Sequence, residues 1–187
     1  MEPLTGALII QQDYFEQNLD VNIKNLSSSI QIMGQQLCSS PTIGFLLNYN
    51  FNKSFDSIFE NIIIDIEQNY TSNNSDENNS IKLDRMINLA RDRGSTIYTS
   101  SKFSNNICII VSKNQSVFND NDTNILLNIH ERRNFIEIIC VENFTEIYKI
   151  INKLFTNFSY KETKKIQTLL SFADKTFDTE IYQLASL

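Results

Sequence analysis

Glycine and histidine are scarce in this chain, which has four glycines and one histidine among its 187 residues. The sequence contains no GxGxxG or GxxxxGK[ST] loop, so nothing in it supports nucleotide binding. One histidine and the lack of a CxxC pair argue against a zinc site. A GxSxG nucleophile motif is also missing. We therefore expect no metal, no other cofactor and no enzymatic activity.

Long apolar runs and a cysteine framework are missing as well. No stretch reaches the roughly 18 uninterrupted apolar residues of a membrane span. The three cysteines are odd in number, and both Cys108 and Cys140 lie inside apolar segments, whereas Cys38 does not. We interpret them as small buried residues of a reducing compartment. The net charge of −6 disfavours stand-alone binding of nucleic acid, because neutralisation of phosphates supplies most non-specific affinity.

Strand and helix patterns alternate along most of the chain. Strands are expected at residues 7–11, 29–34, 44–50, 96–99, 107–111 and 135–141, and helices at 54–67, 83–93 and 145–155. Residues 14–26 remain ambiguous, with a helix as one reading. The segment 107–111 (ICIIV) is apolar on both faces and predicts a central strand of a parallel sheet. The fold class is therefore α/β, a mixed or parallel sheet flanked by helices.

Local signals mark several element ends. Gly94 is expected to end the second helix in the left-handed conformation, and Asp122 to cap a helix after residue 113. Asn143 and Glu146 have the spacing of a capping box. Residues 69–80 (NYTSNNSDENNS) contain no aliphatic side chain, so a flexible surface insertion is expected there.

The C-terminal region shows no strand pattern after residue 157. Two short helices are expected at 161–173 and 179–187, joined by a polar turn at 174–178. Their apolar residues are predicted to dock onto a partner: Ile166, Leu169, Leu170, Phe172, Ile181 and Leu184.

Two motifs resemble parts of known sites. Asn48, Asn50 and Asn52 follow a strand where a von Willebrand A domain holds Mg²⁺, but three neutral amides lack the charge that a hard cation requires. We interpret them as a polar turn. The run 130–133 (HERR) with Glu137 echoes an ERKxxxD nuclease signature, yet it stands before the strand rather than after it, and ICVEN around Glu142 lacks the basic residues.

Lysines form a cluster late in an otherwise acidic chain. The cluster consists of Lys149, Lys153, Lys161, Lys164 and Lys165. These residues fit either a solvated helix face or a surface that contacts phosphate. A weaker basic group is formed by Arg85, Arg91 and Arg93.

In its order of elements the chain resembles the non-nuclease partner subunits of the XPF-type structure-specific endonucleases. The similar segments are ALIIQ, IMGQQLC leading into TIGFLLNYN, ICIIVSK, FIEIICV and FTEIYKIINKLF, followed by a tail, KETKKIQTLLSFADKTFDTEIYQLASL, like the start of a helix-hairpin-helix module. The fungal meiotic branch of that family is the most similar in size. No glycine follows Gly94, so the tail lacks the glycine-rich turn that usually meets phosphate.

The resemblance implies an inactive nuclease-like α/β domain at residues 1–157 and a helical dimerisation element at 158–187. It implies a nuclear, chromosomal, non-catalytic subunit that forms a heterodimer with an XPF-like protein. Such a complex binds branched DNA and stabilises meiotic crossover intermediates during homologous recombination. The alternative is an inactive von Willebrand A-like adaptor without a metal site, which requires central strands within residues 81–106.

Overall fold

The structure of the chain is a computed structural model that describes residues 5–31, 40–48, 55–69, 77–100, 107–113, 135–156 and 166–186. The expected cap at Asp122 lies outside these residues. Among the helices of the described residues, none is both long enough and apolar enough to cross a membrane.

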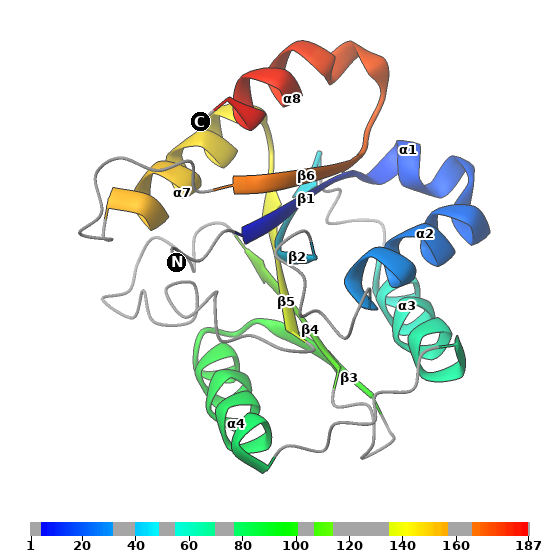
Figure 1. Ribbon diagram of the computed structural model, residues 1–187, viewed down its shortest axis with the longest axis vertical. Coiled ribbons are helices and arrows are strands. Elements are labelled where there is room, and N and C mark those ends of the chain that lie inside the picture. Colours follow the sequence, from blue (N-terminus) through cyan, green and yellow to red (C-terminus); the bar gives the residue numbers. More distant parts are fainter. Residues whose placement is uncertain are drawn as a thin grey trace.

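A six-stranded sheet forms the centre of the molecule (Figure 1). Its strands are β1 (Thr5–Gln11), β2 (Pro41–Leu47), β3 (Thr96–Thr99), β4 (Cys108–Lys113), β5 (Phe135–Val141) and β6 (Ile166–Phe172). In space they follow the order β3-β4-β5-β2-β1-β6. Only β3 runs antiparallel to its neighbour, β4, and the other neighbours pair in parallel.

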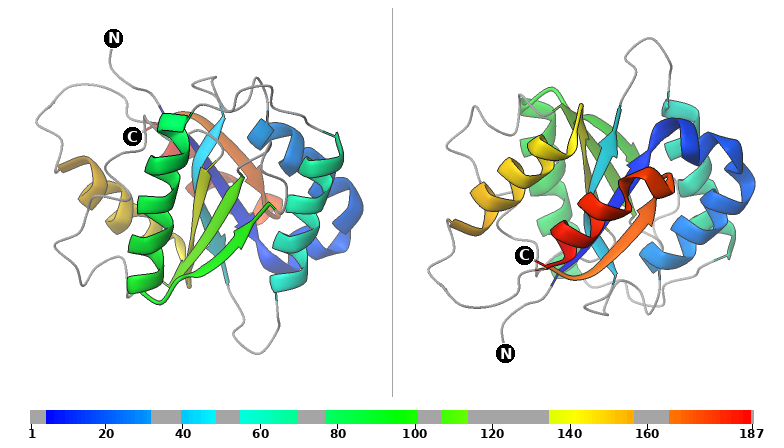
Figure 2. Two further views of the ribbon diagram at one scale, coloured as in Figure 1. Left: turned by 90° about the horizontal axis from the view of Figure 1, so that it is seen from below. Right: turned by 90° about the horizontal axis from the view of Figure 1, so that it is seen from above.

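Helices cover both faces of this sheet, as the two views of Figure 2 show. One face carries α1 (Gln12–Gln17), α2 (Leu19–Gln31) and α3 (Asp56–Asn69). The other face carries α4 (Glu77–Asp92), α7 (Phe144–Thr156) and α8 (Asp178–Ala185), with a short 3₁₀ helix, η4 (Lys175–Phe177), before α8. The expected α/β class with a mixed sheet flanked by helices is confirmed.

Aromatic rings connect the elements on the α1–α3 face. Phe15 of α1 meets Phe172 of β6 edge-on, with ring centroids 5.2 Å apart. A further series of contacts runs from Phe15 through Phe55 and Phe59 to Tyr98 of β3. Because these rings are buried, they tie the helices to strands at both sides of the sheet.

The central strands pack closely because Gly44, in the central strand β2, has no side chain. A Cβ atom at Gly44 of β2 would lie 3.2 Å from Ile138 Cγ1 and 3.3 Å from Leu8 Cδ2. Glycine at this position therefore lets the side chains of the two neighbouring strands meet above β2. All seven residues of β2 and of β5 are buried, as expected for parallel strands covered on both faces.

The helix-end signals at Gly94 and at Asn143 are confirmed. Gly94 has a φ of +71° and ends α4, with the Ser95 N–H donating to Ala90 O (3.0 Å) and the Gly94 N–H to Arg91 O (2.9 Å). At the start of α7, the Asn143 side chain accepts a hydrogen bond from the Glu146 N–H (3.2 Å). The Glu146 carboxylate in turn accepts from the Glu142 N–H (2.8 Å), one residue earlier than in a standard capping box.

Two expectations in the first half of the chain are wrong in part. Residues 29–31 of the expected strand belong to α2, because Ile30 continues the buried stripe of that helix with Ile23 and Leu26. Residues 32–34 lie outside the described residues. The expected insertion at 69–80 is also too long at both ends, because Asn69 is the last residue of α3 and α4 begins at Glu77. Residues 70–76 lie outside the described part.

The C-terminal expectation needs a larger correction. Residues 166–172 are not helical but form β6, which pairs in parallel with β1 from Thr5↔Ile166 to Ile10↔Phe172. The helix after the polar turn is present as α8. Since β6 belongs to the same sheet as the first strand, the described part of 158–187 is not a separate helical element. It completes the α/β domain.

The apolar residues predicted to face a partner lie within the domain itself. Leu184 is 0% exposed and belongs with α7 and β2 to one core cluster, against which Leu169 and Ile181 pack. Phe172 and Leu170 contact the cluster on the opposite face. Ile166 stands in β6 opposite Thr5. The described side chains of this set, at positions 169, 170, 172, 181 and 184, thus pack on the sheet inside the domain rather than on a separate apolar docking face.

Candidate functional site

Glu137, the acidic residue of the nuclease-like echo, lies in the middle of β5 and is 0% exposed. Its cross-strand neighbours are Ile43 and Ile110, which belong to separate clusters on the α7 and α4 sides of the same sheet face. The Ser112 hydroxyl donates to Glu137 Oε1 (3.0 Å), and the Ser95 and Ser112 hydroxyls are 2.9 Å apart. The bond to Oε1 offsets part of the cost of burying this carboxyl group.

This burial determines what Glu137 can do. A carboxylate that serves as a metal ligand at a strand end must reach solvent and a substrate, whereas this one lies between two apolar clusters. Residues 130–133 lie outside the described part of the chain. Within the described residues, no group of three or more histidine, cysteine, aspartate or glutamate side chains is placed to hold a metal ion. The Glu137 carboxylate therefore acts as a structural group of the core.

The carboxyl ends of the parallel strands are where ligands bind in open α/β sheets, at the point where successive connections leave on opposite faces. Here that point lies between β2, which leads to α3, and β5, which leads to α7. Asn48 follows β2 with a φ of +57°, and its N–H donates to Val141 O (3.1 Å). Asn50 and Asn52 lie outside the described residues. Beside Asn48, Glu142 and Asn143 are engaged in the cap of α7.

The two cysteines of the central strands are buried thiols. Burial raises the pKa of Cys108 to about 12, with the nearby Arg91 acting in the opposite direction. Burial likewise raises the pKa of Cys140 to about 12, opposed by Lys113. At neutral pH both thiols are therefore protonated and weakly nucleophilic.

The predicted lysine cluster is only partly described. Lys149 is exposed on α7, and Lys153 follows four residues later in the same helix. Lys161, Lys164 and Lys165 lie outside the described residues. The structure thus places the backbone positions of the first two about one turn apart on one helix.

The solvent-facing residues Tyr148 and Lys149 of α7 and Tyr182 of α8 are together called the α7–α8 surface. The Tyr148 hydroxyl donates to Glu180 O (3.0 Å), which holds the two helices side by side (Figure 2). Partial burial, and secondarily the Glu180 charge, raise the pKa of Tyr148. Tyr182 on α8 is 74% exposed. Tyrosine is enriched at surfaces that contact other macromolecules.

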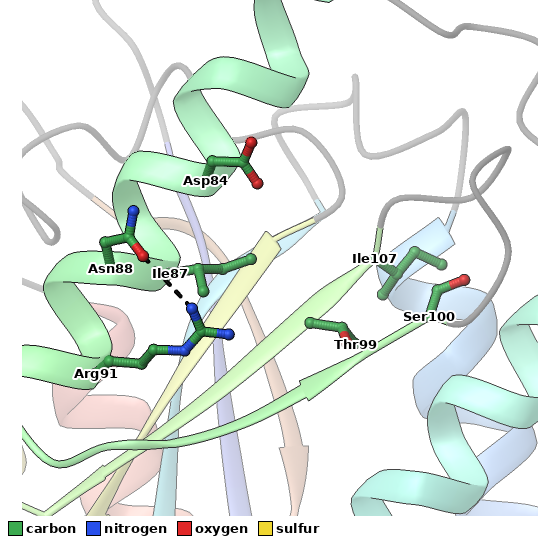
Figure 3. A pocket seen from close by; sticks show the side chains of 7 residues that line it. All are labelled: Asp84, Ile87, Asn88, Arg91, Thr99, Ser100 and Ile107. Carbon is green, nitrogen blue, oxygen red and sulfur yellow. Dashed lines mark hydrogen bonds between the residues drawn. The ribbon is translucent and has the colours of Figure 1, made fainter.

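A cleft of about 400 Å³ opens between α4 and the ends of β3 and β4 (Figure 3). Its lining is Asp84, Ile87, Asn88 and Arg91 from α4, and Thr99, Ser100 and Ile107 from the strand side. The Arg91 guanidinium donates to Asn88 Oδ1 (3.4 Å). The Ser100 hydroxyl donates to Glu67 Oε1 of α3 (2.6 Å). The cleft is thus polar along its rim and carries one charge of each sign.

Sequence reasoning missed this cleft. Arg91 was noted only as part of a weak basic group, and Asp84 and Asn88 were not singled out. The available signal was a polar row at positions 84, 88 and 91 of a helix that buries Ala90 on its other side. The position of that row beside an edge strand depends on the sheet order, which local patterns do not reveal.

No protein-family model matches the chain, and a search of curated proteins found no match either. Solved structures with a similar fold include aldehyde dehydrogenases. An NAD-dependent aldehyde dehydrogenase from Burkholderia multivorans has a TM-score of 0.58 at 11% identity, over 98% of this chain and 33% of its own. Succinic semialdehyde dehydrogenase from Streptococcus pyogenes, solved with NADP+, has a TM-score of 0.56 at 17% sequence identity. That match covers 91% of this chain and 41% of the dehydrogenase chain.

These similarities show the fold alone. The chain spans about two fifths or less of the length of these dehydrogenases. Their identities are far too low to transfer residues, and one fold hosts many functions. In this chain α1 begins directly after β1, and Gln12 at its start is buried with its amide donating to Glu16 (3.2 Å). No glycine is present there to bring a backbone close to a pyrophosphate.

Proposed function

We propose that this chain is the non-catalytic subunit of a heterodimer with an XPF-like protein, and that the complex binds branched DNA. The observation that carries the proposal is the burial of Glu137. The one carboxylate that the nuclease echo places in a central strand is hydrogen-bonded to Ser112 inside the core, where it cannot bind a catalytic metal. The sequence resemblance supplies the partner class, the role in meiotic crossover recombination and the nuclear location.

The α7–α8 surface supports the proposal as a contact surface in place of the buried tail residues. Tyr182 offers an exposed aromatic ring, a residue type enriched at the centres of interfaces. Lys149 and Lys153 on the adjoining helix offer positive charge for phosphate, in a chain whose net charge is negative. The partner is therefore expected to supply much of the electrostatic attraction to DNA.

The von Willebrand A-like adaptor requires central strands within residues 81–106. The described part of that segment, residues 81–100, holds the end of α4 and the edge strand β3. Neither is a central strand, so we prefer the subunit proposal.

Co-expression with an XPF-like subunit tests the proposal. Light scattering should give the mass of a one-to-one complex, and the complex should bind a branched duplex more tightly than a linear one. Tyr182→Glu should weaken the complex, whereas Val21→Glu on the opposite face is the matched control, because Val21 is also exposed. A stable monomer that ignores both partner and DNA would contradict the proposal and favour the adaptor.

A second pair of variants addresses DNA. Replacing Lys149 and Lys153 with Glu should weaken binding of the complex and flatten its salt dependence by about two counterion equivalents. Lys24→Glu on α2 is exposed and lies on the other face, so it is the matched charge control for the single variant Lys149→Glu. Equal salt slopes for all of these proteins would remove the lysines of α7 from the proposed contact.

A further inference from the structure

β3 is a terminal strand whose outer side is not paired with any strand among the described residues. The Ser100 N–H donates to Ile107 O (3.0 Å), which fixes the register of its antiparallel pairing with β4. Hydrogen-bonded and non-hydrogen-bonded pairs alternate in such a ladder. Tyr98 is therefore bonded to β4, whereas Ile97 and Thr99 direct their N–H and C=O groups outward. An exposed edge of this kind is a template for another strand.

The cleft beside α4 lies along this same edge. Thr99 pairs with Cys108, whose side chain belongs to the cluster under α4, so the Thr99 side chain is on the α4 face of the sheet. Figure 3 shows the Arg91 side chain of α4 extending across toward Thr99, with Asn88 bonded to it from the same helix. A strand added next to β3 would direct every second side chain into this cleft.

The charges in the cleft have a spacing that suits such a strand. Asp84 and Arg91 are seven residues apart, but the Arg91 side chain reaches back to Asn88. Its guanidinium is therefore level with residue 88, four residues and about 6 Å along the helix axis from Asp84. Side chains two residues apart on one face of a strand are separated by about 7 Å. An acidic and a basic side chain at such positions would meet Arg91 and Asp84 together.

We propose that β3 and the α4 cleft bind an extended peptide segment by strand addition, recognising an acidic and a basic side chain two residues apart. The peptide backbone bonds to the outward groups of Ile97 and Thr99. Its acidic side chain pairs with the Arg91 guanidinium, which matches a carboxylate in a two-pronged geometry. Main-chain bonds supply affinity, and the paired charges supply selectivity. This inference is independent of the proposed heterodimer.

Peptide titrations by fluorescence anisotropy test the proposal. The probes are labelled Val/Thr peptides of about eight residues, the length of a long strand, carrying Glu-x-Lys or Lys-x-Glu at the centre. Control peptides have the same composition with Glu and Lys adjacent, which places the charges on opposite faces of a strand. One of the spaced peptides should bind at least about tenfold more tightly than its control, since two charged contacts are gained.

Variants separate backbone pairing from charge recognition. Thr99→Pro removes one outward N–H but no bond to β4, and proline is tolerated on an edge strand. It should weaken binding of the preferred peptide by up to about tenfold. Arg91→Glu should abolish the preference for the spaced charges, whereas Lys24→Glu on α2, away from the cleft, should leave it unchanged. Circular dichroism should show an unchanged fold for all three, because each residue is exposed.

Amide hydrogen exchange supplies an independent measurement. In the free protein the amides of Ile97 and Thr99 should exchange faster than that of Tyr98, and the bound peptide should slow them selectively. Absence of saturable binding at millimolar peptide would overturn the proposal, as would binding indifferent to both Thr99→Pro and charge spacing. A dimer that forms without peptide and is lost in Thr99→Pro would assign the edge to a second copy of this chain instead.

Discussion

Truncation of Leu184 distinguishes a core position from a docking position. The side chain is 0% exposed in α8 and packs in the cluster formed by α7 and the inner strands. Removal of a fully buried leucine side chain loses its transfer free energy and leaves a cavity, which together cost about 2–5 kcal/mol. The total stability of a domain is about 5–15 kcal/mol. Leu184→Ala should therefore remove a large share of the free energy of unfolding.

Urea denaturation followed by circular dichroism measures this loss. With a denaturant slope of about 2 kcal/mol per molar, the unfolding midpoint should fall by about 1–2.5 M. Tyr182→Ala is the matched control, two residues away in the same helix but 74% exposed, and should change stability by no more than about 0.5 kcal/mol. The opposite outcome, an unchanged midpoint for Leu184→Ala, would mean that α8 does not pack on the sheet.

Three further measurements address the core. Ser112→Ala should cost about 1–3 kcal/mol in urea unfolding, because Glu137 Oε1 loses a buried donor, and Ser112→Thr should retain most of the stability. Burial raises the pKa of Cys108 and Cys140 from 9.0 to about 12, so the unfolded state loses its thiol protons first. Stability should fall between about pH 9 and 12, by on the order of 1 kcal/mol per pH unit for each thiol, and a double alanine variant should have a shallower slope. Gly94→Ala should cost about 1–2 kcal/mol from the positive φ alone, since its Cβ would meet no atom within 4 Å; a thermal melt showing no loss would refute this.

Local chemistry made much of the fold predictable. Residues 135–141 are apolar except for Glu137, and they form β5 with the bounds read from the sequence. Gly94 marked the end of α4 because only glycine adopts a positive φ without cost. Asn143 marked the start of α7 because its side chain replaces a missing backbone partner. In each case the signal and the structure that it specifies lie within a few residues of each other.

The tail was misread because its partner is distant in the sequence. Leu169 and Leu170, with Ile166 and Phe172, have helical spacing, yet the segment pairs with β1 more than 150 residues earlier. In the strand, adjacent leucines point to opposite faces, and each meets a different core cluster. The same apolar residues are thus compatible with a helix and with a strand. The segment is a strand because β1 has a side that no other described strand pairs with, and β6 pairs there.

The candidate cleft escaped prediction for a related reason. Asp84, Asn88 and Arg91 read as the solvated face of an amphipathic helix, the usual role of such a row. Their proposed binding role depends on β3, which is the edge strand beside them. The backbone N–H and C=O groups of Ile97 and Thr99 point outward from that edge. Charged side chains and unpaired main-chain groups are each common on protein surfaces. Their alignment at the spacing of a strand is what selects an extended peptide over a globular surface as the ligand.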